Sequence, residues 1–266
     1  MARGTREDRG AFRAFGAFGD LRWSVAIGRA VERMTKASSL GLEAIEVVRL
    51  HEQVYQTLTR ALMSGRIPPG RKLTSRKLAA ELGTSDMPVR AALVRLQSLR
   101  ALVALPNGSL ILPRMRRGQF ADLMAARVLC EGQAAELAAS HATAADLRAI
   151  RQAGAALTQA ALDQDIDDYL ARNYEFKFHI YRACGSEALI FLIETLWLQA
   201  APFLRQFAGK FEGALAGILE IDYHDELAAA LAERNATLAG ALMRRDIHEG
   251  AEYLLAHGDF DAEASS

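Results

Sequence analysis

The sequence has little cysteine, no uninterrupted apolar run of membrane length and no net charge. Cys130 and Cys184 are its only cysteines, and each lies in an apolar helical pattern. This excludes a disulfide framework and favours a reducing, cytoplasmic location. The most apolar stretch, 188–204, contains Glu194 and Gln199 and is short for a membrane span. We therefore expect a core helix there and no contact with a membrane.

The first 44 residues also lack a clear pattern, because their Gly, Phe and Arg residues are scattered and show little helical periodicity. They contain neither the apolar core nor the cleavage site of a signal peptide. We expect residues 1–44 to form a flexible arm. The alternative is an upstream extension, with translation beginning at Met34. The rest of the chain is apolar enough to form two folded domains.

The zero net charge hides an asymmetry along the chain. Residues 45–117 carry 13 Arg or Lys residues against 4 acidic residues, a net charge of +9. Residues 118–266 carry 11 basic and 23 acidic residues, a net charge of −12. A basic module followed by an acidic one favours a polyanionic partner for the first module only.

Residues 45–114 show the pattern of a winged helix-turn-helix. Three helical stretches come first, the second capped by Thr74 and the third by Ser85. Two short apolar strands, 102–105 and 110–112, then flank a Pro-Asn-Gly turn. Three helices followed by a hairpin, in that order, predict a DNA-binding domain.

From residue 118 to 258 the pattern is helical, with no strand signal. Pro202 should kink or weaken the fourth helix of this region. Six helices are expected, at roughly 118–141, 143–162, 165–184, 186–208, 216–235 and 237–256. The predicted fold class is therefore mostly α, a winged helix-turn-helix followed by an all-α bundle of about six helices.

The second helix of a helix-turn-helix enters the major groove with its N-terminal residues on the base edges. In this chain that helix begins at Ser85, and the preceding helix directs a basic side chain toward the same groove. The turn of the hairpin forms a wing tip suited to the minor groove. The residues predicted to contact DNA are Arg76, Ser85, Asp86, Met87, Arg90, Asn107 and Gly108.

The run GRIPPGRKLTSRKLAAELGTSDMPVRAALVRLQSLRALVALPNG resembles the DNA-binding domain of the GntR family of bacterial regulators. The helical part resembles FCD, the ligand-binding domain of the FadR-like branch. It carries an Arg-x3-Glu-x2-Ala-Ala pattern at Arg127 and the run HDELAAALAERNATLAGALMRRD at 224–246. The resemblance covers about 50–256. It implies a homodimer that binds a palindromic operator, and that releases it or rearranges when a small organic acid binds.

Three residues depart from the family pattern. Asp86 stands where the family usually has Arg, Ala91 replaces a usual Glu, and Gly108 replaces a common wing Arg. An Asp at the start of the recognition helix repels phosphate but can accept a hydrogen bond from cytosine. Alternatively, it only favours the positive end of the helix dipole.

Helical periodicity decides which polar residues of NYEFKFH, 173–179, face the core. Asn173 and Lys177 share the apolar stripe of their helix, whereas Glu175 and His179 lie on the opposite, charged face. We therefore predict that Glu175 and His179 are solvated and form no metal site.

The same periodicity turns His224 and Asp246 inward on the last two helices. The resemblance adds that many FCD domains bind a divalent metal through Asp-x3-His and two later His residues 22 apart. Here those positions hold Asn173, Lys177, His224 and Asp246. An ammonium group has no lone pair for a metal. We therefore expect no cofactor, with weak metal binding through His224 and Asp246 as the residual alternative.

We hypothesise that Lys177 replaces the metal charge and holds a ligand carboxylate. The predicted effector-binding residues are Arg127, Asn173, Lys177, Tyr181, His224 and Asp246. One alternative is a regulator that has lost its effector response, with Lys177 and Asp246 as a structural ion pair. Another is an enzyme that uses Lys177 as a base or imine-forming amine. The leading prediction is a dimeric transcription regulator, not an enzyme.

Overall fold

The computed structural model describes residues 47–211 and 215–262, so the arm expected at 1–44 lies outside the described residues. The first part of the described chain combines three helices with three very short strands. In chain order these are α2 (Val47–Met63), β1 (Lys72–Leu73), α3 (Ser75–Glu81), α4 (Asp86–Ser98), β2 (Val103–Ala104) and β3 (Leu110–Ile111).

The sheet of this part is larger than the hairpin expected from the sequence. Its strands are antiparallel in the order β1-β3-β2, so β1 adds to the free edge of β3. Lys72 pairs with Ile111, and Val103 pairs with Ile111 from the other side. Two residues are too short a segment to show a period-two pattern, which is why the sequence did not reveal β1.

The helices of this part form where predicted, but two of their caps differ. α2 buries Val54, Leu58 and Leu62, one residue per turn on one face. Thr74 and Ser85 occupy the N-cap positions of α3 and α4, yet neither side chain accepts a capping hydrogen bond. The predicted cap positions are therefore right, and the predicted side-chain caps are absent.

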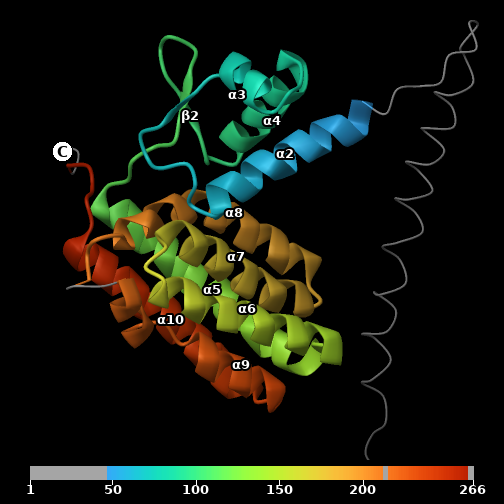
Figure 1. Ribbon diagram of the computed structural model, residues 1–266, viewed down its shortest axis with the longest axis vertical. Coiled ribbons are helices and arrows are strands. Elements are labelled where there is room, and N and C mark those ends of the chain that lie inside the picture. Colours follow the sequence, from blue (N-terminus) through green and yellow to red (C-terminus); the bar gives the residue numbers. More distant parts are fainter. Residues whose placement is uncertain (1–46, 212–214, 263–266) are drawn as a thin grey trace, which may run out of the picture. The chain divides into compact units, whose positions relative to one another are not determined.

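The second part of the described chain is entirely helical, which confirms the mostly α fold class. Figure 1 shows α5 and α10 lying side by side, and α6 packs along α7. The elements are α5 (Arg117–His141), α6 (Ala144–Leu162), α7 (Ile166–Ala183), α8 (Glu187–Leu204), η1 (Arg205–Phe207), η2 (Leu215–Glu220), α9 (His224–Ala232) and α10 (Ala236–His257).

Four of these helices begin at a polar residue whose side chain accepts a backbone N–H from the first turn. The capping residues are Thr143 for α6, Asp165 for α7, Ser186 for α8 and Asn235 for α10. Each such cap contributes about 1 kcal/mol. These caps fix the start of each helix, and so the rotational position of the side chains that follow.

The predicted helix 216–235 is wrong as one element. The chain forms the 3-10 helix η2 first and starts α9 only at His224. The backbone N–H and Nδ1 of His224 both contact Asp222 Oδ1, at 3.1 and 2.8 Å. In one continuous helix, residues two apart point in nearly opposite directions. The break allows Asp222 and His224 to meet.

Close contact between α5 and α10 depends on two glycines. A Cβ at Gly132 would lie 2.5 Å from the side chain of Arg244, and one at Gly240 would lie 2.4 Å from that of Glu136. Arg244 and Glu136 form an ion pair at 2.8 Å across the same contact. Two missing side chains therefore leave room for an ion pair that joins the helices.

The most apolar described helical segment, Glu187–Phe207, is long and apolar enough to span a membrane by length and composition. A core helix passes the same test. Ile193, Trp197 and Leu198 on this segment are at most 1% exposed. One face of it therefore packs in the core, as the sequence predicts, while Phe191 and Leu192 are exposed. Pro202 lies inside it, and the regular helix ends two residues later.

Candidate functional site

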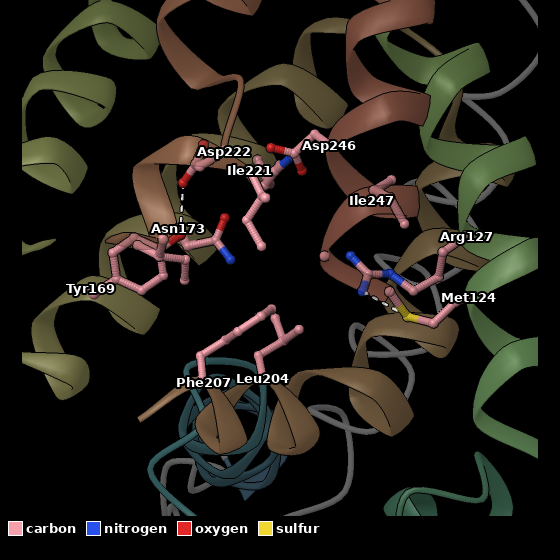
Figure 2. A pocket seen from close by; sticks show the side chains of 13 residues that line it. Met124, Arg127, Tyr169, Asn173, Leu204, Phe207, Ile221, Asp222, Asp246 and Ile247 are labelled. Carbon is pink, nitrogen blue, oxygen red and sulfur yellow. Dashed lines mark hydrogen bonds and ion pairs between the residues drawn. The ribbon is translucent and has the colours of Figure 1, made fainter. Parts of the chain in front are cut away.

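The helical part contains a small, partly open cavity of about 50 Å³ between α5, α7 and α10. In Figure 2 the Asn173 amide and the Arg127 guanidinium point toward its centre from opposite sides, while Leu204 and Phe207 form an apolar wall. The lining residues are Met124, Arg127, Tyr169, Asn173, Lys177, Leu204, Phe207, Ile218, Ile221, Asp222, Asp246, Ile247 and Gly250.

Lys177 is the buried cation of this cavity. Its side chain is 3% exposed, and Nζ donates a hydrogen bond to Oδ2 of Asp246 from α10. Burial raises the pKa of Asp246, although the charge of Lys177 acts in the opposite direction. The other oxygen of Asp246 accepts from the backbone N–H of Tyr223 at 3.2 Å. The predicted inward direction of Lys177 therefore matches the structure.

Arg127 lines the cavity from α5, and its positive charge is paired with Glu131 on the same helix. Its Nε and Nη2 donate to the two oxygens of Glu131, at 2.5 and 3.1 Å, and both side chains are buried. The hydroxyl of Tyr181 donates to the same Glu131 carboxylate. Arg127 therefore lines the cavity as predicted. Tyr181 does not line it, and its hydroxyl instead binds the Glu131 carboxylate that pairs with Arg127.

Asp222 is a cavity residue that the sequence analysis missed. It accepts a hydrogen bond from the Tyr169 hydroxyl at 2.7 Å and contacts His224 Nδ1 at 2.8 Å. His224 Nε2 lies 2.7 Å from the Thr158 hydroxyl. His224 is thus buried behind Asp222 and does not itself line the cavity.

The Asp222–His224 pair shifts both pKa values. Burial alone would raise the pKa of Asp222, but the hydrogen bond and charge of His224 lower it overall. Burial alone would lower the pKa of His224, but the hydrogen bond and charge of Asp222 raise it above 6.5. The folded protein therefore favours the charged form of each partner.

Glu175 and His179 lie on the other face of α7. Glu175 is exposed and accepts from Arg172 at 2.8 Å, and His179 is half-buried. Asn173, by contrast, lines the cavity, and among the described residues no hydrogen bond to its amide is present. The structure therefore places Asn173, Lys177 and Glu175 as periodicity predicts, whereas His179 is only partly exposed.

The four positions that would carry the family metal do not suit one here. Lys177 occupies the position of a ligand with a protonated amine engaged by Asp246. Both ring nitrogens of His224 already have partners, Asp222 and Thr158. Within residues 47–211 and 215–262, no group of three or more His, Cys, Asp or Glu side chains has the arrangement of a metal site.

The residues predicted to touch DNA lie at the N-terminus of α4 and on its neighbours. Met87 is 69% exposed, and Arg76 and Arg90 are also exposed. Asp86 forms an ion pair with Arg90 one turn later, at 2.9 Å. Its hydrogen bond with Ser75 is the main cause of its lowered pKa. Asp86 therefore pairs with Arg90, one of the residues that the sequence predicts to contact DNA.

The wing tip is a tight, exposed turn. Ser109 donates from both its backbone N–H and its hydroxyl to Oδ1 of Asn107, at 3.1 and 2.6 Å. Gly108 has φ +76°, a conformation that residues with a side chain rarely adopt. Asn107 and Gly108 therefore have the shape expected of a wing tip.

Known proteins match both parts of this chain. The FCD domain family matches residues 122–249. The family described as bacterial regulatory proteins, gntR family, matches residues 50–111. The HTH-type transcriptional regulator McbR of Escherichia coli K12 is 32% identical over 164 residues, which is 62% of this chain and 74% of McbR.

Solved structures agree with these sequence matches. The structure of E. coli McbR/YncC has a TM-score of 0.71 at 27% identity and covers 78% of this chain and 97% of its own. A GntR transcriptional regulator from Rhodococcus sp. RHA1 shares the fold, with a TM-score of 0.60 at 19% identity over 77% of this chain and 97% of its own. The chain belongs to the GntR family of bacterial regulators and is a DNA-binding transcriptional regulator with an FCD domain.

Proposed function

We propose that this regulator responds to a small organic acid that binds in the cavity of the helical domain without a metal ion. In this proposal the ligand carboxylate interacts with Lys177, Arg127 and Asn173. Its binding changes the affinity of the winged helix-turn-helix for the operator. The observation that carries the proposal is a buried ammonium group, that of Lys177, at the wall of a cavity.

A buried cation beside a cavity is a suitable anion site for two reasons. Charge-assisted hydrogen bonds are shorter and roughly twice as strong as neutral ones. Their electrostatic energy is also screened less by solvent where water is excluded. The side chains of Lys177 and Arg127 are both about 3% exposed. The apolar wall opposite them, which includes Leu204 and Phe207, suits a short carbon skeleton.

We further propose that the regulator acts as a homodimer on a palindromic operator, as the family resemblance implies. A two-fold protein matches two half-sites related by the same symmetry. Three large apolar side chains on the helical part are free to be covered by association. Leu129 of α5 is 70% exposed, and Phe191 and Leu192 of α8 are 58% and 50% exposed.

The effector proposal can be tested on operator DNA recovered by selection from random sequences. Binding would be followed by fluorescence anisotropy with and without acetate, lactate, malonate, succinate and alanine. We expect at least one acid to shift operator affinity, and Lys177→Met to abolish that shift. Arg148→Met, which removes an exposed charge from α6, is the matched control and should keep it.

The same experiment identifies the alternative in which effector response is lost. Operator affinity would then be unchanged by every acid, and wild-type protein and Lys177→Met would behave alike. That result would make the Lys177–Asp246 pair purely structural and contradict the effector proposal.

A further inference from the structure

The buried charges around the cavity balance one another. Each basic side chain that lines or adjoins it has a carboxylate partner: Arg127 with Glu131, Lys177 with Asp246, and His224 with Asp222. A ligand with a net negative charge would add an unmatched charge to a buried site, which is unfavourable. A ligand whose own charges cancel avoids this penalty.

Asp222 and Asp246 both line the cavity and keep acceptor capacity for a ligand. Asp222 accepts two hydrogen bonds from His224 and one from Tyr169. A carboxylate has about four lone-pair sites, so about one remains on Asp222. Asp246 uses two, for Lys177 and the Tyr223 backbone, and about two remain.

The two carboxylates also repel one another. Both carboxylates line the same cavity, and two like charges close together in a buried site are unfavourable. A cationic group bound between Asp222 and Asp246 would relieve this repulsion and occupy their free lone pairs. An ammonium group, with three donors and no acceptor, is suited to that position.

The cavity offers donors as well as acceptors. The Asn173 amide has two N–H donors, and no described residue accepts from them. Arg127 uses Nε and one Nη2 hydrogen for Glu131, and its Nη1 contacts only the weak acceptor Met124 Sδ at 3.5 Å. Figure 2 shows both groups directed toward the centre of the cavity. A ligand carboxylate can accept from both.

From these complementary groups in one cavity we infer that the effector is a zwitterion, a small amino acid or a close analogue. Its carboxylate binds Arg127, Asn173 and Lys177, and its ammonium group binds Asp222 and Asp246. The inference rests on the proposed function, because it names the class of acid that the same site takes. The cavity is small, about 50 Å³, which suits a ligand of a few carbon atoms.

Matched pairs of ligands that differ only in the amine test this inference directly. The pairs are glycine with acetate, alanine with propionate, and 4-aminobutyrate with butyrate. Binding to the full-length protein would be measured by isothermal titration calorimetry. We expect at least one amino acid to bind about 10- to 100-fold more tightly than its amine-free partner, the effect of one charge-assisted hydrogen bond.

Asp222→Asn tests whether the amine is recognised where the structure indicates. This variant should reduce the preference for the amino acid to about threefold or less, while binding of the plain acid is kept or improved. Glu226→Gln removes a carboxylate from the exposed face of α9 and should keep the full preference. Should Asp222→Asn fail to fold, the ligand pairs on wild-type protein still test the zwitterion, and Asp246→Asn tests where its amine binds.

The outcomes separate this inference from the proposed function. If the plain acids bind as tightly as the amino acids, the inference of a zwitterionic effector is wrong, but the proposal of a carboxylate effector is retained. If none of the six compounds binds, the zwitterion is contradicted, and the acids tested with operator DNA decide the effector proposal. Preference for an amino acid that survives Asp222→Asn and also Asp246→Asn would overturn the assignment of the amine to these carboxylates.

Discussion

Lys177 of α7 and Asp246 of α10 form a buried ion pair at the wall of the cavity in the helical part, with side chains 3% and 13% exposed. The two residues are 69 positions apart in the sequence. In related FCD domains the resemblance assigns both positions to metal ligands. This chain therefore holds a cation of its own where its relatives are expected to hold a metal, and the first and last predictions below depend on that pair.

Removing one partner of this pair should be costly. Lys177→Met leaves Asp246 buried without its cation, and loss of one partner from a buried pair typically costs about 3–5 kcal/mol. Replacing both partners with apolar residues avoids the unmatched charge. We therefore expect Lys177→Met/Asp246→Leu to be much more stable than either single variant, as measured by urea unfolding followed by circular dichroism.

The exposed pair Arg245–Glu249 provides the control. These side chains lie 2.6 Å apart but are 60% and 30% exposed, and such surface pairs contribute about 0–1 kcal/mol. Arg245→Met should hardly change the unfolding midpoint. If Lys177→Met were equally mild, the buried pair would not be important for stability.

Asp86 should limit the affinity of α4 for DNA. Its carboxylate pairs with Arg90 and places a negative charge at the predicted DNA surface. Asp86→Asn frees Arg90, so we expect tighter binding to all sequences and a steeper fall of affinity with salt. Arg90→Ala should reduce the slope of log K against log salt concentration by about one. Fluorescence anisotropy over a salt series measures both effects.

Glu81→Gln is the control for Asp86→Asn, because it removes an exposed acidic charge from α3. It should change affinity less than Asp86→Asn does. A different outcome, in which Asp86→Asn weakens binding only to the selected operator, would show that Asp86 accepts a hydrogen bond from a base.

The His224–Asp222 pair should make stability depend on pH. Asp222 raises the pKa of His224 above 6.5 even though burial opposes this. The stabilisation is therefore complete below 6.5 and is lost as pH rises through the higher, folded-state pKa. We expect the thermal midpoint of the wild type to fall over that range. In His224→Gln this fall of the thermal midpoint with pH should be absent. An equal fall in that variant would show that another group causes it.

The proposed dimer predicts a solution mass of twice the 29.0 kDa of the chain. Light scattering after size exclusion measures this mass. Leu129→Glu places a charge on an exposed apolar position of α5. We expect it to shift the equilibrium toward the monomer if α5 contributes to the interface, while the exposed Asp122→Asn substitution on the same helix should not. A monomer at micromolar concentration would contradict the dimer.

The fold and much of the cavity could be predicted because both depend on helical periodicity. Asn173 and Lys177 share a stripe with apolar residues, so their direction follows from 3.6 residues per turn. Asp222 could not be predicted in this way. Its place in the cavity results from the break between η2 and α9, and the apolar pattern continues through that break.

Helical periodicity also could not predict the hydrogen-bond and ion-pair partners of buried side chains. A stripe places Tyr181 inward and the family resemblance draws attention to Arg127, but neither shows that Glu131 engages both. The predicted donor role of Tyr181 toward a ligand rested on direction alone. Which buried groups pair with each other depends on how helices far apart in the sequence pack together. The apolar pattern of a single helix does not contain that information.

The most direct test of the account is the metal content of protein purified without chelator or added metal, measured by elemental analysis. We predict no stoichiometric metal in the wild type. We also predict about one equivalent of zinc in Asn173→Asp/Lys177→His, which restores the two ligands that the family pattern expects. Stoichiometric zinc, nickel or manganese in the wild type, lost in His224→Ala, would contradict the claim that Lys177 replaces the metal.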